Sequence, residues 1–261
     1  MVASRGRPCY HLTVRILFFL LPLCIMTTLS QANSTWKQVF SDPGTDDWES
    51  RWFLDGKIAT VTNTPEGLVF KTGPIGDGDA SHGVLWTRET FEGDVRIEYD
   101  FTRLDNNLDH IAVCILFIHA EGIGEGPFVS DIHAWRELRE IPRMSLYFNH
   151  MNLYHISYAC TGGEDQDYVR ARQYPASRGF HEMQIDPSYE KVGFFQPGET
   201  WHMVFEKNGS SLSLTASRED QKRVFLWDLG SRPALTQGRI GLRQMRGRES
   251  LITHFKVYQR K

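Results

Sequence analysis

The chain has 261 residues and a formal net charge of −3, with 29 basic and 32 acidic side chains. Because the charges are nearly balanced and no block of Lys and Arg occurs, the sequence gives no indication of a nucleic-acid partner. Aromatic residues make up 12% of the chain and there are 22 glycines. This composition is typical of many short strands joined by tight turns.

The first residues have the composition of an export signal. Basic residues come first, Ile16–Met26 is an apolar core, and Ser30-Gln31-Ala32 offers small residues to a signal peptidase. The apolar core is shorter than the about 20 residues that a membrane-spanning helix needs. We expect a signal peptide over residues 1–32 and export to the periplasm or the extracellular space, without stable membrane insertion after cleavage. A retained N-terminal anchor is the alternative.

Strand patterns and turn signals alternate along the rest of the chain. Thr64-Pro65-Glu66 and Asn208-Gly209 are typical hairpin turns. In 94–102 apolar and polar residues alternate, and Ile111–Ala120 is a continuous apolar run that predicts a central strand covered on both faces. About fifteen short strands without internal repeats predict a single all-β domain over residues 33–261, a two-sheet antiparallel jelly-roll sandwich.

One long interval, Glu121–Arg143, breaks the strand pattern. Glycines open it, and Asp131–Glu140 is predicted as a short helix that stops before Pro142. A long insertion in a sandwich is usually functional or mobile. We expect Trp135, with its neighbours, to form a wall of a cleft.

The aromatic stretch that follows is the strongest candidate for a binding surface. Two runs, Ser145–Asn149 and Leu153–Ala159, are predicted as neighbouring strands. With regular alternation, one sheet face then carries Tyr147, Asn149, His155 and Ser157. Aromatic rings and hydrogen-bonding groups on one face suit a sugar, whereas the alternative is a buried sheet whose polar groups are satisfied internally.

Cysteines and acidic turns leave two structural questions open. Cys114 and Cys160 are the two cysteines beyond the signal, and export permits a disulfide between them, but free buried cysteines are equally compatible with their apolar surroundings. Asp77-Gly78-Asp79 and Asp105-Asn106-Asn107 with Asp109 offer oxygen ligands for a structural calcium, although ordinary polar turns look the same. No other cofactor is expected.

Three motifs in a fixed order resemble the YesU-like family of bacterial proteins: His155-Ile156-Ser157-Tyr158, Ser177-Arg178-Gly179-Phe180-His181, and Gly238-Arg239-Ile240-Gly241-Leu242-Arg243-Gln244-Met245. The resemblance runs from Trp48 to Tyr258 and implies a concanavalin A-like or galectin-like β-sandwich. The family takes its name from a Bacillus protein associated with rhamnogalacturonan use, and no reaction is assigned to it.

The first functional hypothesis is a lyase that cleaves an acidic plant or algal polysaccharide by β-elimination. This chemistry needs a base, an acid and a cation that neutralises the uronate carboxylate. His155 is the predicted base and Tyr158 the predicted acid, with Arg178, His181, Arg243 and Gln244 around the carboxylate. Alternation places His155 and Tyr158 on opposite faces unless a bulge intervenes near Ser157; otherwise Tyr158 belongs to the core. For Arg178 and His181 the alternative is a hydrogen-bonded turn.

Two other hypotheses use different residues. A glycoside hydrolase needs paired carboxylates, and Glu98 and Asp100 share one strand face, although a solvated outer sheet is the commoner meaning of such a pair. A non-catalytic carbohydrate-binding module needs only an aromatic platform and polar groups, for which the candidates are Trp86, Trp135, Tyr147 and Asn149, with His155, Arg243 and Gln244 as ligands. Each Trp is more often core than platform. All three hypotheses predict a polysaccharide or oligosaccharide partner.

Overall fold

The computed structural model describes Met1 and residues 35–107, 112–161, 167–175 and 179–260. The chain divides into residues 1–33 and 34–261, and the fold described below is that of the second unit. The predicted signal peptide and Arg178 lie outside the described residues. Within the described part of the chain, no helix is long and apolar enough to cross a membrane.

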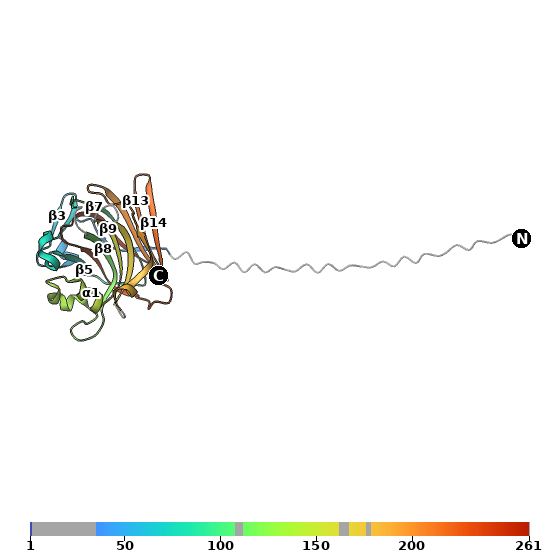
Figure 1. Ribbon diagram of the computed structural model, residues 1–261, viewed down its shortest axis with the longest axis horizontal. Coiled ribbons are helices and arrows are strands. Elements are labelled where there is room, and N and C mark those ends of the chain that lie inside the picture. The colour runs from blue at the N-terminus through green and yellow to red at the C-terminus, as the bar shows by residue number, and fades with distance from the viewer. Residues whose placement is uncertain (2–34, 108–111, 162–166, 176–178, 261) are drawn as a thin grey trace. The chain divides into compact units, whose positions relative to one another are not determined.

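Two eight-stranded antiparallel sheets form the sandwich, in agreement with the predicted fold class (Figure 1). Sheet A has the order β14 (Gln221–Asp228), β13 (Ser211–Arg218), β12 (Thr200–Asn208), β7 (Asp94–Arg103), β16 (Glu249–Arg260), β4 (Gly67–Lys71) and β3 (Thr60–Thr64), with β1 (Lys37–Asp42) paired to β16. Sheet B has the order β11 (Gln184–Glu190), β10 (Tyr168–Tyr174), β9 (Met151–Thr161), β8 (Ala112–Gly122), β15 (Gln237–Gln244), β5 (Gly83–Thr87) and β2 (Trp52–Asp55), with β6 (Phe91–Glu92) paired to β15.

Helical turns connect some of these strands. One short α-helix, α1 (Met144–His150), precedes β9, and the four 3₁₀ helices among the described residues are η1 (Trp48–Ser50), η2 (Ile75–Ser81), η3 (Ile132–Arg139) and η4 (Phe180–Met183). The predicted hairpins are confirmed: Thr64 pairs with Gly67 across β3 and β4, and Asn208 pairs with Ser211 across β12 and β13.

The main core lies between the two sheets and follows the predicted alternation. On β7, Val95, Ile97, Tyr99 and Phe101 are buried in this core, whereas the residues between them are partly exposed. Burial of such side chains stabilises the fold by about 25 cal/mol per Å² of apolar surface removed from water.

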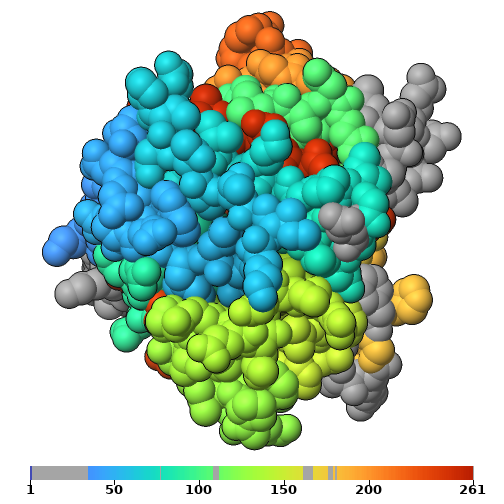
Figure 2. Space-filling model, turned by 90° about the vertical axis from the view of Figure 1, so that its left-hand side faces the viewer, coloured from blue at the N-terminus to red at the C-terminus, as the bar shows by residue number. Residues whose placement is uncertain are grey.

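A second apolar cluster covers the other face of sheet B. Residues of β5, β8 and β9 pack there against η3 and α1, which both belong to the inserted segment 122–150. The segment is the yellow-green lobe of Figure 2. Because sheet B has sheet A on one face and the insertion on the other, β8 is buried along nearly its whole length, and the predicted doubly covered central strand is confirmed.

The prediction for Ser145–Asn149 is wrong, because this segment forms α1 instead of a strand. Its aromatic residues favour a strand by local propensity. Packing decides otherwise, since Tyr147 is fully buried and stacks on Trp86 and Phe117 of sheet B. Only the second run, in β9, is a strand.

Cys114 and Cys160 are both buried, and neither belongs to a disulfide. Cys114 belongs to the core between the sheets, and Cys160 belongs to the cluster under the insertion. Since they lie on opposite faces of sheet B, no disulfide joins them.

Candidate functional site

A cavity of about 150 Å³ lies on the face of sheet B that the insertion covers in part. Its described lining residues combine four apolar side chains with six polar or charged ones, and none of them is acidic. They are Val113, Ile115, Met144 and Met245, together with His82, His155, Ser157, Tyr168, Arg172 and Arg243.

Strand register explains why residues far apart in the sequence meet at this cavity. Ser157 of β9 pairs with Ile115 of β8, and Ile115 pairs with Arg243 of β15, so the three lie in one row across the sheet. Arg172 of β10 pairs with His155 in the adjacent row. At a strand spacing of about 4.8 Å, Ser157 and Arg243 are about 10 Å apart at their backbones, with only Ile115 between them.

Arg243 is the most unusual side chain of the site, because it is 1% exposed and contacts no carboxylate of the described residues directly. Its Nη2 donates to His82 Nδ1 at 2.8 Å and to the Pro142 carbonyl at 2.9 Å, and its guanidinium lies 4.7 Å from the Tyr147 ring centre. Its Nε and Nη1 are buried, and no described residue forms a hydrogen bond with either nitrogen. Burial lowers the pKa of Arg243, but arginine keeps its charge at neutral pH.

The contact with Arg243 defines the tautomer of His82. Arginine has no acceptor, so His82 Nδ1 must accept and the proton of the neutral ring must lie on Nε2. Burial and the charge of Arg243 lower the pKa of His82 to about 3, so the ring is neutral at physiological pH. Its Nε2 is buried without a partner among the described residues. Arg243 and His82 thus hold three buried donor nitrogens for which this part of the chain provides no acceptor.

The carboxylate of Asp79 lies near His82 without forming a hydrogen bond to it. Asp79 lies with one carboxylate oxygen 3.8 Å from His82 Nδ1, beyond hydrogen-bond distance, and half of its side chain is exposed.

His155 lies at the centre of a short hydrogen-bonded chain beside the cavity. Its Nδ1 is 2.6 Å from the Tyr174 hydroxyl and its Nε2 is 2.6 Å from Ser157 Oγ. Burial, together with the positive charges of Arg172 and Arg243, lowers the pKa of His155 well below its ordinary value. The imidazole is therefore neutral, with one nitrogen donating and the other accepting.

The insertion completes the site and is itself anchored by a buried ion pair. Arg139 of η3 donates to Asp55 Oδ2 at 2.5 Å, and the same oxygen accepts from Trp86 Nε1 and from the Tyr147 hydroxyl. These bonds hold Tyr147 against Arg243. Burial raises the pKa of Asp55, and the Arg139 charge opposes this rise.

The predicted aromatic platforms are not available to a ligand. Trp86 is fully buried under the insertion, and Trp135 is buried within it, where Nε1 donates to the Val129 carbonyl. Tyr147 contacts Arg243 but has no exposed surface, so it positions a charge and offers no stacking face. Asn149 is exposed on α1 and does not line the cavity.

Tyr158 and Gln244 are also misplaced by the sequence prediction. Tyr158 lies in the core between the sheets, where its hydroxyl is 2.8 Å from that of Tyr99, so it cannot serve His155 as an acid. The left-handed conformation of Ala159 comes one residue too late to bring Tyr158 to the face of His155. Gln244 follows Arg243 along β15 and therefore points to the opposite face, where its amide donates to Ser250.

The remaining predicted residues divide between the site and the surface. His155 and Arg243 line the cavity, as the hypothesis of a carboxylate-binding site requires. His181 is exposed in η4 and is not among the lining residues. Arg178 lies outside the described residues.

Sequence reasoning missed four polar residues of the site: His82, Tyr168, Arg172 and Tyr174. For three of them, the strand pattern indicates a shared face. Tyr168, Arg172 and Tyr174 occupy alternate positions of one strand and so share its outer face. His82 follows a glycine-rich turn, and nothing in its local sequence indicates that it meets Arg243.

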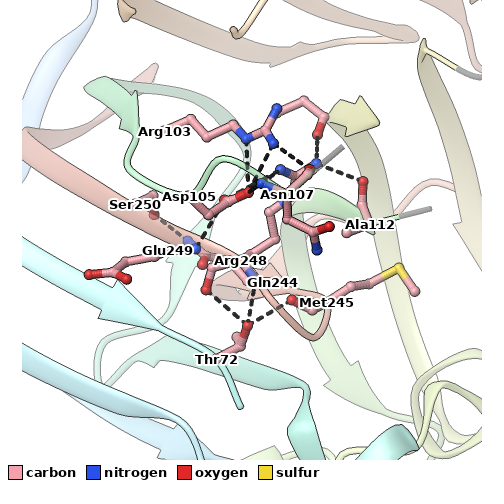
Figure 3. Close-up of polar contacts among 11 residues, drawn as sticks. Thr72, Arg103, Asp105, Asn107, Ala112, Gln244, Met245, Arg248, Glu249 and Ser250 are labelled. Atoms are coloured by element: carbon pink, nitrogen blue, oxygen red, sulfur yellow. Dashed lines mark hydrogen bonds and ion pairs between the residues drawn. The ribbon is translucent and has the colours of Figure 1, made fainter. Parts of the chain in front are cut away.

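A second group of buried arginines, here called the Asp105 cluster (Arg103, Asp105 and Arg248), lies among the ends of β7, β8, β9 and β16 (Figure 3). Arg103 Nε and Arg248 Nη1 donate to Asp105 Oδ1 at 3.1 and 3.0 Å. Burial alone would raise the pKa of the Asp105 carboxyl, but Arg248 and Arg103 hold it below its usual value.

These contacts bear on the calcium hypothesis. Two guanidinium groups occupy the carboxylate that was considered as a calcium ligand. No group of three or more potential metal-ligating side chains occurs among the residues that the structure describes.

The carboxylate pair of the hydrolase hypothesis lies on the outer face of sheet A. Glu98 is paired with Arg96, and Asp100 contacts His202 Nδ1 at 2.8 Å and His254 Nδ1 at 3.0 Å. Each carboxylate is therefore paired with a basic group, as on a solvated sheet surface, and the geometry gives the hydrolase hypothesis no support.

Known proteins resemble this chain in sequence and in fold. A model of the family described as "Domain of unknown function (DUF1961)" matches residues 44–257. The uncharacterized protein YesU of Bacillus subtilis (strain 168) is 27% identical over 186 residues, which cover 69% of this chain and 79% of that protein.

Solved structures share the fold. A Bacillus subtilis protein of unknown function with a galectin-like fold aligns with a TM-score of 0.62 at 22% identity, over 87% of this chain and 99% of that chain. Lectin II from Ulex europaeus aligns with a TM-score of 0.52 at 12% identity, over 84% and 97% of the two chains. The exoplasmic/lumenal domain of VIP36, in a Ca²⁺/Man₃GlcNAc-bound form, aligns with a TM-score of 0.56 at 12% identity, over 86% and 90%. These likenesses confirm the predicted galectin-like sandwich.

Proposed function

The chain belongs to the DUF1961 family, to which no function is assigned, and from the geometry of its cavity we propose that it binds an acidic saccharide through the carboxylate of a uronate. That the ligand is a saccharide is inferred from the fold, which lectin II and the sugar-bound VIP36 domain share. That the ligand is acidic is inferred from the residues of the cavity. The proposed ligands are therefore acidic plant or algal polysaccharides, with rhamnogalacturonan among them.

One observation carries the proposal: among the described residues, two donor nitrogens of the buried Arg243 have no partner, and none of the side chains that line the cavity is acidic. Leaving buried donors without partners costs about 1–3 kcal/mol each, and more for a charged group. An arrangement of this cost is expected where an external acceptor completes it. A carboxylate suits a guanidinium because its two oxygens accept two parallel N–H bonds.

The size of the cavity defines what enters it. About 150 Å³ accommodates a carboxylate and part of one sugar ring, whereas a drug-sized ligand site usually measures about 300–1,000 Å³. We therefore expect the polymer to lie across the opening with one uronate inserted.

Lyase activity on the same ligand needs a revised set of residues. Tyr158 is excluded as the acid by its place in the core, and Tyr174 is the hydroxyl that contacts His155. The His155 nitrogen nearest the cavity already contacts Ser157, so the geometry favours binding over elimination.

The experiment is affinity electrophoresis of the protein through gels that contain polygalacturonate, alginate or a neutral galactan. Absorbance of unsaturated uronate ends and the release of reducing ends are followed in parallel. Retardation by an acidic polymer, with no effect of the galactan, is the expected result. Equal migration in all gels contradicts the proposal, and new ultraviolet absorbance that disappears in His155→Ala identifies an eliminating enzyme instead.

A further inference from the structure

Ser157, His155 and Tyr174 form a continuous hydrogen-bonded chain whose first member opens on the cavity. Ser157 and His155 are two residues apart on β9, so their side chains project from the same face of the strand. Ser157 Oγ lies 2.6 Å from His155 Nε2, and the Tyr174 hydroxyl lies 2.6 Å from His155 Nδ1 on the far side of the ring. A nucleophile, a base within hydrogen-bond reach and a third group that orients the base are the structural requirements of an activated serine.

The surroundings of this chain suit acyl transfer. Ser157 and His155 both line the cavity, and so do Arg172 and Arg243. Arg172 is the cross-strand neighbour of His155. Fixed positive charge in a site from which water is largely excluded stabilises the oxyanion that forms when a serine attacks a carbonyl.

We propose that Ser157 is the nucleophile of an ester hydrolase that removes a small O-acyl group, such as acetyl, from the acidic saccharide bound at Arg243. The inference rests on the proposed function for its substrate and goes beyond it in assigning a reaction. The volume of the cavity limits the acyl group to a small one, because the sugar ring that carries it must also reach the opening.

The reaction balances without any cofactor. Ser157 Oγ forms a bond to the acyl carbon while its proton moves to His155 Nε2, and the carbonyl electron pair goes to oxygen beside Arg172. Collapse of this intermediate breaks the bond to the sugar oxygen, which takes the proton from His155. Water then attacks the acyl carbon and loses a proton to Nε2. The bond between the acyl carbon and Ser157 Oγ breaks, Oγ takes the proton back from His155, and the carboxylic acid is released.

The bound uronate supports this step through its charge. The positive charges of Arg172 and Arg243, after burial itself, lower the pKa of His155 and weaken it as a base. A carboxylate on Arg243 neutralises part of that charge and so raises the basicity of His155. Acidic esters are therefore expected to react faster than neutral ones of the same acyl group.

The experiment measures acetate release from acetylated polygalacturonate by the full chain and by Ser157→Ala, with Ser250→Ala as the matched control. Ser250 is also a buried strand serine, but its hydroxyl contacts Gln244 away from the cavity. We expect Ser157→Ala to lose at least about 100-fold in rate and Ser250→Ala to retain the wild-type rate. A fluorophosphonate probe is expected to add once to the wild-type chain, at Ser157, as mapped by peptide mass spectrometry.

A second variant keeps the test independent of folding defects. Tyr174→Phe preserves the ring and removes only the hydroxyl that orients His155, so we expect a smaller loss, about 10-fold, and a shifted pH profile of the rate. If the wild-type chain releases acetate no faster than Ser157→Ala does, the inference is overturned. A probe adduct at a residue other than Ser157 also overturns it. If polygalacturonate retards the protein in the gel but no acetate is released, only the proposed reaction is overturned. If acetate is released but the protein is not retarded, the proposed function is overturned.

Discussion

Buried arginines occur in two regions of this molecule under opposite conditions. In the Asp105 cluster, Arg103 and Arg248 share one carboxylate and also donate to backbone carbonyls of neighbouring segments. At the cavity, Arg243 is equally buried, but its contacts within the described part of the chain are a neutral imidazole, a carbonyl and an aromatic ring. The first arrangement places a carboxylate in direct contact with its arginines, whereas Asp79 and Asp55 act on Arg243 without contacting it.

The difference separates a structural role from a binding role. Removing two charges from water is repaid only where good geometry and further hydrogen bonds accompany the pair, as they do around Asp105. Arg243 lacks that compensation within the fold. A protein that retains such a group loses stability by it, which is the usual relation between a functional site and the stability of its fold.

The largest effect is expected from Asp105→Asn. This change leaves Arg103 and Arg248 buried without their carboxylate and should lower the free energy of unfolding by about 3–5 kcal/mol, measured by urea denaturation. The control is Asp46→Asn, at an exposed carboxylate, for which a change within about 0.5 kcal/mol is expected. If Asp105→Asn is as stable as this control, the structural role of the cluster is refuted.

Arg243→Met should have the converse effect. We expect binding of polygalacturonate to weaken by at least about 30-fold, the equivalent of about 2 kcal/mol, while the free energy of unfolding stays unchanged or rises. Arg96→Met, on the outer face of sheet A, is the matched control and should bind as the wild type does. Affinity electrophoresis and urea denaturation of the same samples test both parts. Destabilisation by several kcal/mol together with intact binding would reverse the roles assigned to the two regions.

The neutrality of His82 predicts a dependence of stability on pH. Its pKa is about 3 in the folded state and about 6.5 when unfolded. As the pH falls below 6.5, the unfolded chain binds a proton that the folded chain does not, so stability decreases until about pH 3. The slope is about 1 kcal/mol per pH unit for this group.

Replacement of His82 tests whether this side chain causes the dependence of stability on pH. His82→Gln has no titratable group at this position, so it should flatten the decrease between pH 6 and pH 4, measured as unfolding free energy at each pH. An unchanged slope in the variant would show that His82 is not held neutral in the folded protein.

The smallest effect is expected from Tyr147→Phe. The variant loses the hydroxyl that donates to Asp55 but keeps the ring against Arg243. We expect about 1 kcal/mol less stability and nearly unchanged binding of polygalacturonate. Tyr147→Ala removes the ring as well, so a larger loss of binding in that variant would show that the ring positions Arg243.

Sequence patterns predicted the sandwich well because the burial of its strands is visible in their own apolar patterns. The alternation in β7 and the continuous apolar run in β8 reflect local burial directly, and turn residues such as Asn208-Gly209 act within a few positions. The family resemblance gave the same architecture and is confirmed by the match over residues 44–257.

The site was predicted only in part, because it depends on contacts between distant segments. His155 and Arg243 were found from their residue types, but His82 meets Arg243 across 161 positions, which no local pattern reports. Tyr158, the predicted acid, is close to His155 in the sequence but not in the fold. The hydroxyl that contacts His155 is that of Tyr174 on the neighbouring strand. The helical state of the segment around Tyr147 likewise follows from packing on Trp86 and Phe117, against its local propensity.

The most direct test of the account is calorimetric titration of the protein with galacturonate and with galactose. The two sugars differ only in whether the C6 group is a carboxylate or a hydroxymethyl group. If Arg243 binds an external anion, galacturonate binds with a measurable affinity that disappears in Arg243→Met, and galactose gives no comparable heat. Equal binding of both sugars, or binding of galacturonate that survives in Arg243→Met, would contradict the central claim that the fold leaves this arginine for an external carboxylate.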